Sequence, residues 1–254
     1  MNLFFTILII SIFSLILHAR QIGETVITTE DGIEVFQNDK FYLLKKEVKI
    51  ESDNFTLNAD DVKINFDKSL YDITELNAKG NVDFNSNISE ISGNGESLNF
   101  VVKIEKIKVE GKKSKLNIEN INMFSDGFIE VNNLNGNFSL KGLNSKLIND
   151  RIIIIAENID GNFSNKTNEK EITFLKVYDE KLSYVKNDDT EMYAKNINFD
   201  HNTSIIELID NVTIFRNEEK VTGDYGTLDT TNNSYKIKSN NQNKVKVIIQ
   251  NNEQ

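Results

Sequence analysis

Residues 46–73 read KEVKIESDNFTLNADDVKINFDKSLYDI, and this stretch decides the fold because it recurs along the chain. Residues 80–107 and 210–237 align with it without a gap. Apolar residues share columns of that alignment: Val48 with Val82 and Val212, Ile50 with Phe84 and Ile214, Leu57 with Ile91 and Val221, and Ile64 with Leu98 and Leu228. Apolar residues two apart, flanked by Asn, Asp, Ser or Gly, are typical of a strand with two different faces. One such unit cannot bury its apolar face alone, so the repeat predicts an elongated, stacked β structure.

The same alternation predicts further strands outside the aligned columns. The first half shows it at residues 41–51, 54–58, 62–66, 70–78 and 81–85. Strand patterns at a spacing of roughly 8–12 residues, with turn-forming residues between them, indicate an all-β architecture. We find no long amphipathic helix pattern after residue 20.

The middle of the chain, residues 112–187, follows the pattern less regularly. Residues 151–156 read RIIIIA, a continuous apolar run that suits a strand buried on both faces or lying against a partner. Residues 162–170 form the most polar stretch and are predicted to be a long loop or a subdomain boundary. We interpret the middle as a divergent section of one β domain over residues 21–254, either an insertion or additional strand pairs.

The first 20 residues have the composition of an export signal. Leu3 to Leu17 is almost wholly apolar and is followed by His18, Ala19 and Arg20. It is shorter than the roughly 20 residues that a membrane-spanning helix needs. We therefore predict a cleaved signal peptide over residues 1–20, with a retained membrane anchor as the alternative. Since an exported chain without cysteine suits a bacterial periplasm, we expect a Gram-negative periplasmic protein.

Composition excludes several function classes. The 254-residue chain has a formal net charge of −10, which argues against nucleic acid as a partner. It has no cysteine and only two histidines, so a thiol nucleophile and a histidine-pair zinc site are both excluded. His201, in a turn-like Asp-His-Asn-Thr, is predicted to be a surface residue. No serine stands in a Gly-x-Ser-x-Gly motif. We expect no enzyme activity, no metal and no cofactor.

Two glycines of the repeat have a structural explanation. Gly93 and Gly223 share a column with Ala59. Glycine inside a strand pattern marks a bulge or a close approach of another backbone, and we predict one of these here. A phosphate-binding loop would need a following helix, and the sequence predicts none.

The alternating apolar side chains can have either of two roles, and periodicity alone does not distinguish between them. They fill a dry core, or they line an open-ended slot that accepts a long apolar ligand. The residues that we single out are the inward-facing apolar ones at the repeat columns. These lipid-slot candidates are Val48, Ile50, Leu57, Ile64, Val82, Phe84, Ile91, Leu98, Val212, Ile214, Val221 and Leu228.

Several motifs resemble the organic-solvent-tolerance-A-like (OstA-like) family, which includes the LptA-type lipopolysaccharide transport proteins. In the first half they lie within residues 32–110, and in the last part within residues 189–249. They are Gly32-Ile33-Glu34-Val35, Lys46-Glu47-Val48-Lys49-Ile50, Leu57-Asn58-Ala59-Asp60-Asp61-Val62, Ala78-Lys79-Gly80-Asn81-Val82, Asp210-Asn211-Val212, Val221-Thr222-Gly223-Asp224-Tyr225 and Lys244-Val245-Lys246-Val247.

The resemblance implies a twisted, folded-over antiparallel β-jellyroll that is open along one side. It implies binding of the acyl chains of lipopolysaccharide in that slot, transport between inner- and outer-membrane proteins of the same pathway, and end-to-end joining of copies. If residues 1–20 are retained, the membrane-anchored LptC-like component of the pathway is the better comparison. The residues alone are equally consistent with an alternative, an exported structural β-solenoid with a dry core. A carbohydrate-active enzyme would need a pair of facing carboxylates, which a sequence does not show.

Overall fold

The computed structural model describes residues 24–86, 88, 90–149, 152–164, 170–240 and 244–249. The predicted signal segment, residues 1–20, lies outside the described residues. The described part is almost all β-strand, with one short 3-10 helix, η1 (Val102–Ile104). The strands, in chain order, are β1 (Val26–Thr28), β2 (Ile33–Phe36), β3 (Phe41–Glu51), β4 (Phe55–Phe66), β5 (Ile73–Ser86), β6 (Ile91–Val101), β7 (Lys106–Glu110), β8 (Ser114–Ile118), β9 (Ile121–Ser125), β10 (Phe128–Asn132), β11 (Asn137–Asn149), β12 (Ile152–Ser164), β13 (Glu171–Asn187), β14 (Thr190–Asp200), β15 (Ile205–Arg216), β16 (Glu219–Asp229), β17 (Ser234–Lys238) and β18 (Lys246–Ile249).

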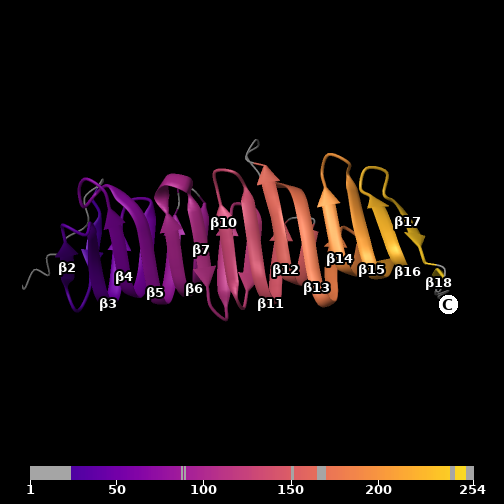
Figure 1. Cartoon of the computed structure of the whole chain (residues 1–254), viewed down its shortest axis with the longest axis horizontal. Helices are drawn as coiled ribbons and strands as arrows, with labels where there is room; N and C mark the ends of the chain where they lie inside the picture. Colours follow the sequence, from indigo (N-terminus) through magenta and orange to yellow (C-terminus); the bar gives the residue numbers. More distant parts are fainter. Residues whose placement is uncertain are drawn as a thin grey trace, which may run out of the picture.

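All of these strands belong to one twisted antiparallel sheet. From β2 to β6 and from β11 to β17, each strand is hydrogen-bonded to the next strand in the chain. The molecule is therefore a long row of strands, with the amino-terminal strands at one end and the carboxyl-terminal strands at the other (Figure 1). The predicted all-β, antiparallel fold is confirmed.

The long strands are bent near their centres, and the first two columns of the sequence repeat form the bend. Backbone φ is positive at Lys46 and Glu47 (59° and 48°) and at Asp210 and Asn211 (65° and 57°). The pair Gly80-Asn81, at 73° and 47°, occupies the same columns. The ladder changes register at these points, for example between Lys45 and Val48 in the β3–β4 pair. The left-handed residues turn β3, β5 and β15 at their centres, and the ladders of the long strands shift register at the same level, so each long strand has two halves.

At the middle of the row, two short strands replace one bent strand. β7 pairs with one half of β6 and β8 pairs with the other half. In the same way β10 and β9 pair with the two halves of β11. Gly111, with φ of 130°, lies in the turn between β7 and β8. The cross-section of the row is thus maintained, and strands β8 to β13 of the predicted divergent middle section continue the same sheet.

The two halves of the sheet face each other and enclose the hydrophobic core. Each long strand buries alternate residues on both sides of its bend, as β4 does with Leu57 and Ala59 and then with Val62, Ile64 and Phe66. These side chains belong to one hydrophobic cluster that runs the length of the row. In the described residues no helix or second sheet covers them, so the opposite half-sheet does. This is the folded-over β-jellyroll that the sequence resemblance implied.

Several local predictions are also confirmed. The first long strand has the predicted bounds, Phe41–Glu51. A Cβ at Gly93 would lie 2.6 Å from the Lys115 carbonyl oxygen and 2.8 Å from the Phe84 ring. A Cβ at Gly223 would lie 2.7 Å from the Lys238 carbonyl oxygen. Close backbone approach therefore explains both glycines. One local prediction is wrong: residues 54–58 and 62–66 are not separate strands but the two halves of β4.

Candidate binding clefts

The strand ends form two rims along the open side of the folded sheet. Because each long strand bends at its centre, both of its ends lie on the side away from the bend. Rim 1 contains the turns at 52–54, 119–120, 188–189 and 217–218. Rim 2 contains the turns at 67–72, 102–105, 133–136, 201–204 and 230–233, together with Lys170. Any ligand that enters the interior from this side passes between the two rims.

The larger opening, the C-terminal cleft, has a volume of about 710 Å³. Its floor is apolar and comes from β12 to β15. One strand, β13, contributes Leu175 and Val177 from one half and Val185 from the other, which shows that the halves face each other across the cleft. The remaining apolar lining residues are Ile152, Ile172, Ile197, Phe199 and Ile206. The volume lies within the roughly 300–1,000 Å³ typical of small-ligand sites.

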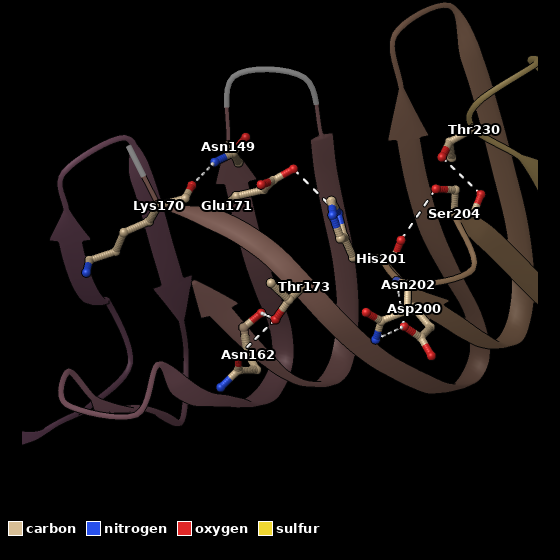
Figure 2. Close-up of polar contacts among 10 residues, drawn as sticks. All are labelled: Asn149, Asn162, Lys170, Glu171, Thr173, Asp200, His201, Asn202, Ser204 and Thr230. Carbon is tan, nitrogen blue, oxygen red and sulfur yellow. Dashed lines mark hydrogen bonds and ion pairs between the residues drawn. The ribbon is translucent and has the colours of Figure 1, made fainter. Parts of the chain in front are cut away.

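Polar side chains surround the mouth of the C-terminal cleft (Figure 2). His201 Nδ1 lies 3.5 Å from Glu171 Oε1, and the Ser204 hydroxyl donates to the His201 carbonyl oxygen at 3.4 Å. The Thr230 hydroxyl in turn donates to the Ser204 carbonyl oxygen at 3.0 Å. These contacts join neighbouring turns of rim 2. The rim 1 side of the mouth is formed by Asn120, Asn149, Asn187 and Asp188.

The smaller opening, the N-terminal cleft, has a volume of about 300 Å³. Most of its lining is apolar and comes from β4 to β7 and η1: Phe55, Leu76, Phe84, Ile91, Leu98, Phe100, Val102 and Ile107. Three polar residues, Ser86, Glu105 and Asn133, complete the lining. Asn133 Nδ2 donates to Glu105 Oε2 at 2.8 Å, which joins two turns of rim 2. Each cleft therefore has an apolar floor below a polar mouth, the arrangement that matches an amphiphile.

Between the two clefts the interior is filled by the protein's own side chains. Residues of β8 to β11 are fully buried there, with no accessible surface: Leu116, Ile118, Ile121, Met123, Ile129, Val131, Leu140 and Leu147. Phe138 and Phe163 stack next to them with ring centroids 5.9 Å apart. We call this region the sealed middle. The open side of the sheet is thus not one uniform slot.

The structure places all twelve lipid-slot candidates in the interior, each at most 6% exposed. Only Phe84, Ile91 and Leu98 line a cleft, the N-terminal one. Eight of the other nine belong to the hydrophobic cluster, Val221 is buried outside it, and none of the nine lines the C-terminal cleft. The repeat columns do not identify the residues of that cleft, because β13 lies outside the aligned repeats. The alternation of Leu175 and Val177 is the sequence signal that points to them.

The described residues offer no cluster of metal ligands. They contain no group of three His, Cys, Asp or Glu side chains that could hold a metal ion. His201 is half exposed, as predicted for a surface residue, but it stands at the mouth of the C-terminal cleft. Among the described residues no helix has the length and apolar character needed to span a membrane.

Comparisons with known proteins find similar solved structures but no similar family model or curated sequence. No protein-family model matches the chain, and no curated protein sequence matches it. Among solved structures, the chain is similar to LptH from Pseudomonas aeruginosa, described as the LptA homologous periplasmic component of a lipopolysaccharide transport device. The match has 12% sequence identity and a TM-score of 0.43, and it covers 52% of this chain and 96% of that chain. A match of this size is a likeness of part of the fold and does not identify a ligand.

Proposed function

We propose that the chain is a periplasmic lipopolysaccharide-binding transport protein of the OstA-like type. In this proposal it carries the acyl chains of lipid A between the inner- and outer-membrane proteins of the pathway, and it leaves its ligand chemically unchanged. The observation that carries the proposal is the pair of clefts, each with an apolar floor and a polar mouth, on the open side of a folded sheet. The motifs of the repeat and the apolar segment Leu3–Leu17 support it.

Burial of acyl chains supplies the driving force. Each methylene that leaves water contributes about 0.8 kcal/mol, so ten methylenes contribute about 8 kcal/mol before the costs of association. The sugar and phosphate groups of the ligand would stay in water above the rims. The acidic character of the chain, with its net charge of −10, then opposes binding only weakly because solvent and salt screen the charges.

The two ends of the row support end-to-end joining of copies. The amino-terminal end exposes Ile33 and Val35, at 53% and 41%, and the carboxyl-terminal end exposes Val247 and Ile249, at 55% and 62%. An exposed strand with apolar side chains is a template for pairing with another strand. If residues 1–20 are retained in the membrane, the same fold would serve as the membrane-anchored, LptC-like component instead.

Mass spectrometry of lipids extracted from the purified periplasmic protein tests the proposal. We expect lipid A to copurify, and photocrosslinking to lipopolysaccharide to be lost in Phe84→Asp and Leu98→Asp, because a carboxylate in the N-terminal cleft opposes burial of an alkyl chain. Asn94→Asp, on the exposed face of the same strand as Leu98, is the matched control and should crosslink normally. Unchanged crosslinking in folded Phe84→Asp and Leu98→Asp proteins would contradict lipid binding in this cleft.

The sealed middle favours a second candidate, an exported structural β protein whose core is dry. Its fully buried side chains, such as Met123 and Ile129, leave no room for a ligand there. A structural protein would copurify with no lipid and would keep its role when either cleft is filled. The same mass-spectrometric measurement therefore separates the two candidates.

A further inference from the structure

We infer that the open side holds two separate ligand sites, divided by a partition at Lys170. Each site takes one alkyl chain of an amphiphile, and the part of the head group that lies at the mouth is uncharged and bears hydroxyl groups. This inference rests on the proposed function, because it presupposes that the open side binds lipids. It adds the number of sites, their separation and the class of head group.

The first layer of the partition is a set of backbone contacts across the mouth. Lys170, on rim 2, donates its backbone N–H to Asn120 Oδ1 on rim 1 at 3.1 Å. Asn120 Nδ2 returns a hydrogen bond to the Lys170 carbonyl oxygen at 3.3 Å, and Asn149 Nδ2 donates to the same oxygen at 3.4 Å. Figure 2 shows Asn149 directed at this carbonyl. The two rims are therefore joined at this point.

The second layer is the Lys170 side chain, which is only 6% exposed. Its Nζ lies 3.3 Å from Glu119 Oε1 on rim 1 and 4.6 Å from the centroid of the Phe163 ring. Phe163 is 1% exposed and stacks on Phe138. The ammonium group thus covers the aromatic pair and connects it to the opposite rim.

The sealed middle completes the partition below these two layers. Side chains such as Ile118, Ile121 and Met123 have no accessible surface, so an alkyl chain in one cleft has no path to the other. Asn120 and Lys170 line the C-terminal cleft at this boundary, and Glu105 and Asn133 line the N-terminal cleft. A single extended chain would have to open the contacts at Lys170 and displace packed core side chains.

The charges at the two mouths select the part of the head group that adjoins the alkyl chain. The mouth of the C-terminal cleft carries Glu171 and Asp188, and its lysine, Lys170, contacts Glu119. The residues that line the N-terminal cleft in the described part of the chain include Glu105 and neither lysine nor arginine. An anionic group at the mouth itself would meet carboxylates in both places, whereas phosphates held above the rims would stay in water. Amides and hydroxyls such as Asn187 and Ser204 instead complement sugar hydroxyls.

Native mass spectrometry with n-decyl maltoside, below its critical micelle concentration, tests the inference on the full delipidated chain. We expect two bound molecules. Leu98→Trp fills the N-terminal cleft and Leu175→Trp fills the C-terminal cleft, and each should lose one molecule and keep the other. The matched controls Asn94→Trp and Lys176→Trp place the same ring on the exposed face of the same strands and should bind two. Decanoate, which has an anionic head group, should bind several-fold more weakly.

A photoreactive decyl maltoside on the unaltered protein makes the test independent of whether the tryptophan variants fold. Crosslinked peptides should fall into two groups, around Phe84–Leu98 and around Leu175–Ile206, with none at Ile129 or Leu140. One bound molecule that is lost in both tryptophan variants would overturn the partition and leave the proposed function standing. No bound amphiphile at all, or a copurifying peptide in place of lipid, would overturn both.

Discussion

The sealed middle and the two clefts are made by the same sheet with the same bend, yet their interiors differ. In the sealed middle, β8 to β10 have only five residues each, and two short strands take the place of one long one. At the C-terminal cleft, β13 has 17 residues, and its halves extend to rims that stay apart. Alternation of apolar residues therefore specifies an inward face, whereas the opposite half-sheet decides whether the space in front of that face is filled.

The largest expected effect compares one leucine from each region. Leu140→Ala in the sealed middle should lower the free energy of unfolding by about 3 kcal/mol, because it leaves a cavity among fully buried side chains. Leu175→Ala should cost about 1 kcal/mol, since its side chain already borders an open cleft. Urea unfolding of both variants measures the difference. Equal losses would show that the two interiors are packed alike.

An intermediate effect is expected at the boundary between the two regions. Lys170→Met removes the partner of Glu119 and should cost about 2 kcal/mol, less than for a fully buried pair because the Glu119 side chain is 27% exposed. The matched control is Lys106→Met, whose partner Glu130 lies 2.9 Å away in an ion pair about one-third exposed on both sides. Its cost should stay below about 1 kcal/mol.

Urea unfolding of the lysine variants, together with Lys170→Met/Glu119→Gln, measures these costs. The double variant should recover part of the lost stability, because it removes the unpaired carboxylate. A loss in Lys170→Met no larger than in Lys106→Met would mean that the contacts at Lys170 do little to hold the rims together.

The smallest effect concerns the dependence of stability on pH. It is expected in the carboxyl-terminal strands and not in the sealed middle, because the chain has no tyrosine between residues 72 and 177. The Tyr225 hydroxyl donates to Glu207 at 2.8 Å, and this hydrogen bond raises the pKa of Tyr225. Burial, followed by the hydrogen bond to Glu219, raises the pKa of Tyr235. A raised pKa in the folded state adds stability that is complete below the unfolded value of about 10 and is lost as pH rises through the folded value.

Tyr225→Phe should therefore flatten the fall in stability above pH of about 10, with a change below about 1 kcal/mol at neutral pH. Unfolding midpoints measured across alkaline pH test this, and Tyr71→Phe, at a residue that is 92% exposed, is the control. Hydrogen exchange at high pH should accelerate in β15 and β16 before it does in β8 to β11. The reverse order would contradict this assignment.

Much of the fold follows from the sequence because strand alternation is a local property. The columns that begin with Val48, Val82 and Val212 correctly align three structurally equivalent strands, and each of these valines directly follows a left-handed bend. The bend itself was not predicted. Gly80-Asn81 and Asp210-Asn211 suit a positive φ, but Lys46-Glu47 in the same columns do not, so the shared property was hidden.

The clefts could be predicted only in part. The twelve candidates are all inside, but whether an inward side chain meets another side chain or open space depends on the opposite half-sheet, which no local pattern encodes. Phe84 and Leu98 line a cleft, whereas Val212 and Ile214 have the same alternation and lie in the core. The contacts of Lys170 with Asn120 join residues 50 positions apart, a separation that periodicity does not detect.

The order of the strands also determines how the molecule responds to tension. The strands stand roughly across the long axis, so the hydrogen bonds between them run nearly along it (Figure 1). A force that pulls the two ends apart would load these bonds one strand pair at a time, beginning at the termini, rather than all together. A protein that spans a gap between two moving attachments would then lengthen gradually by peeling, while the packed centre is the last part to yield.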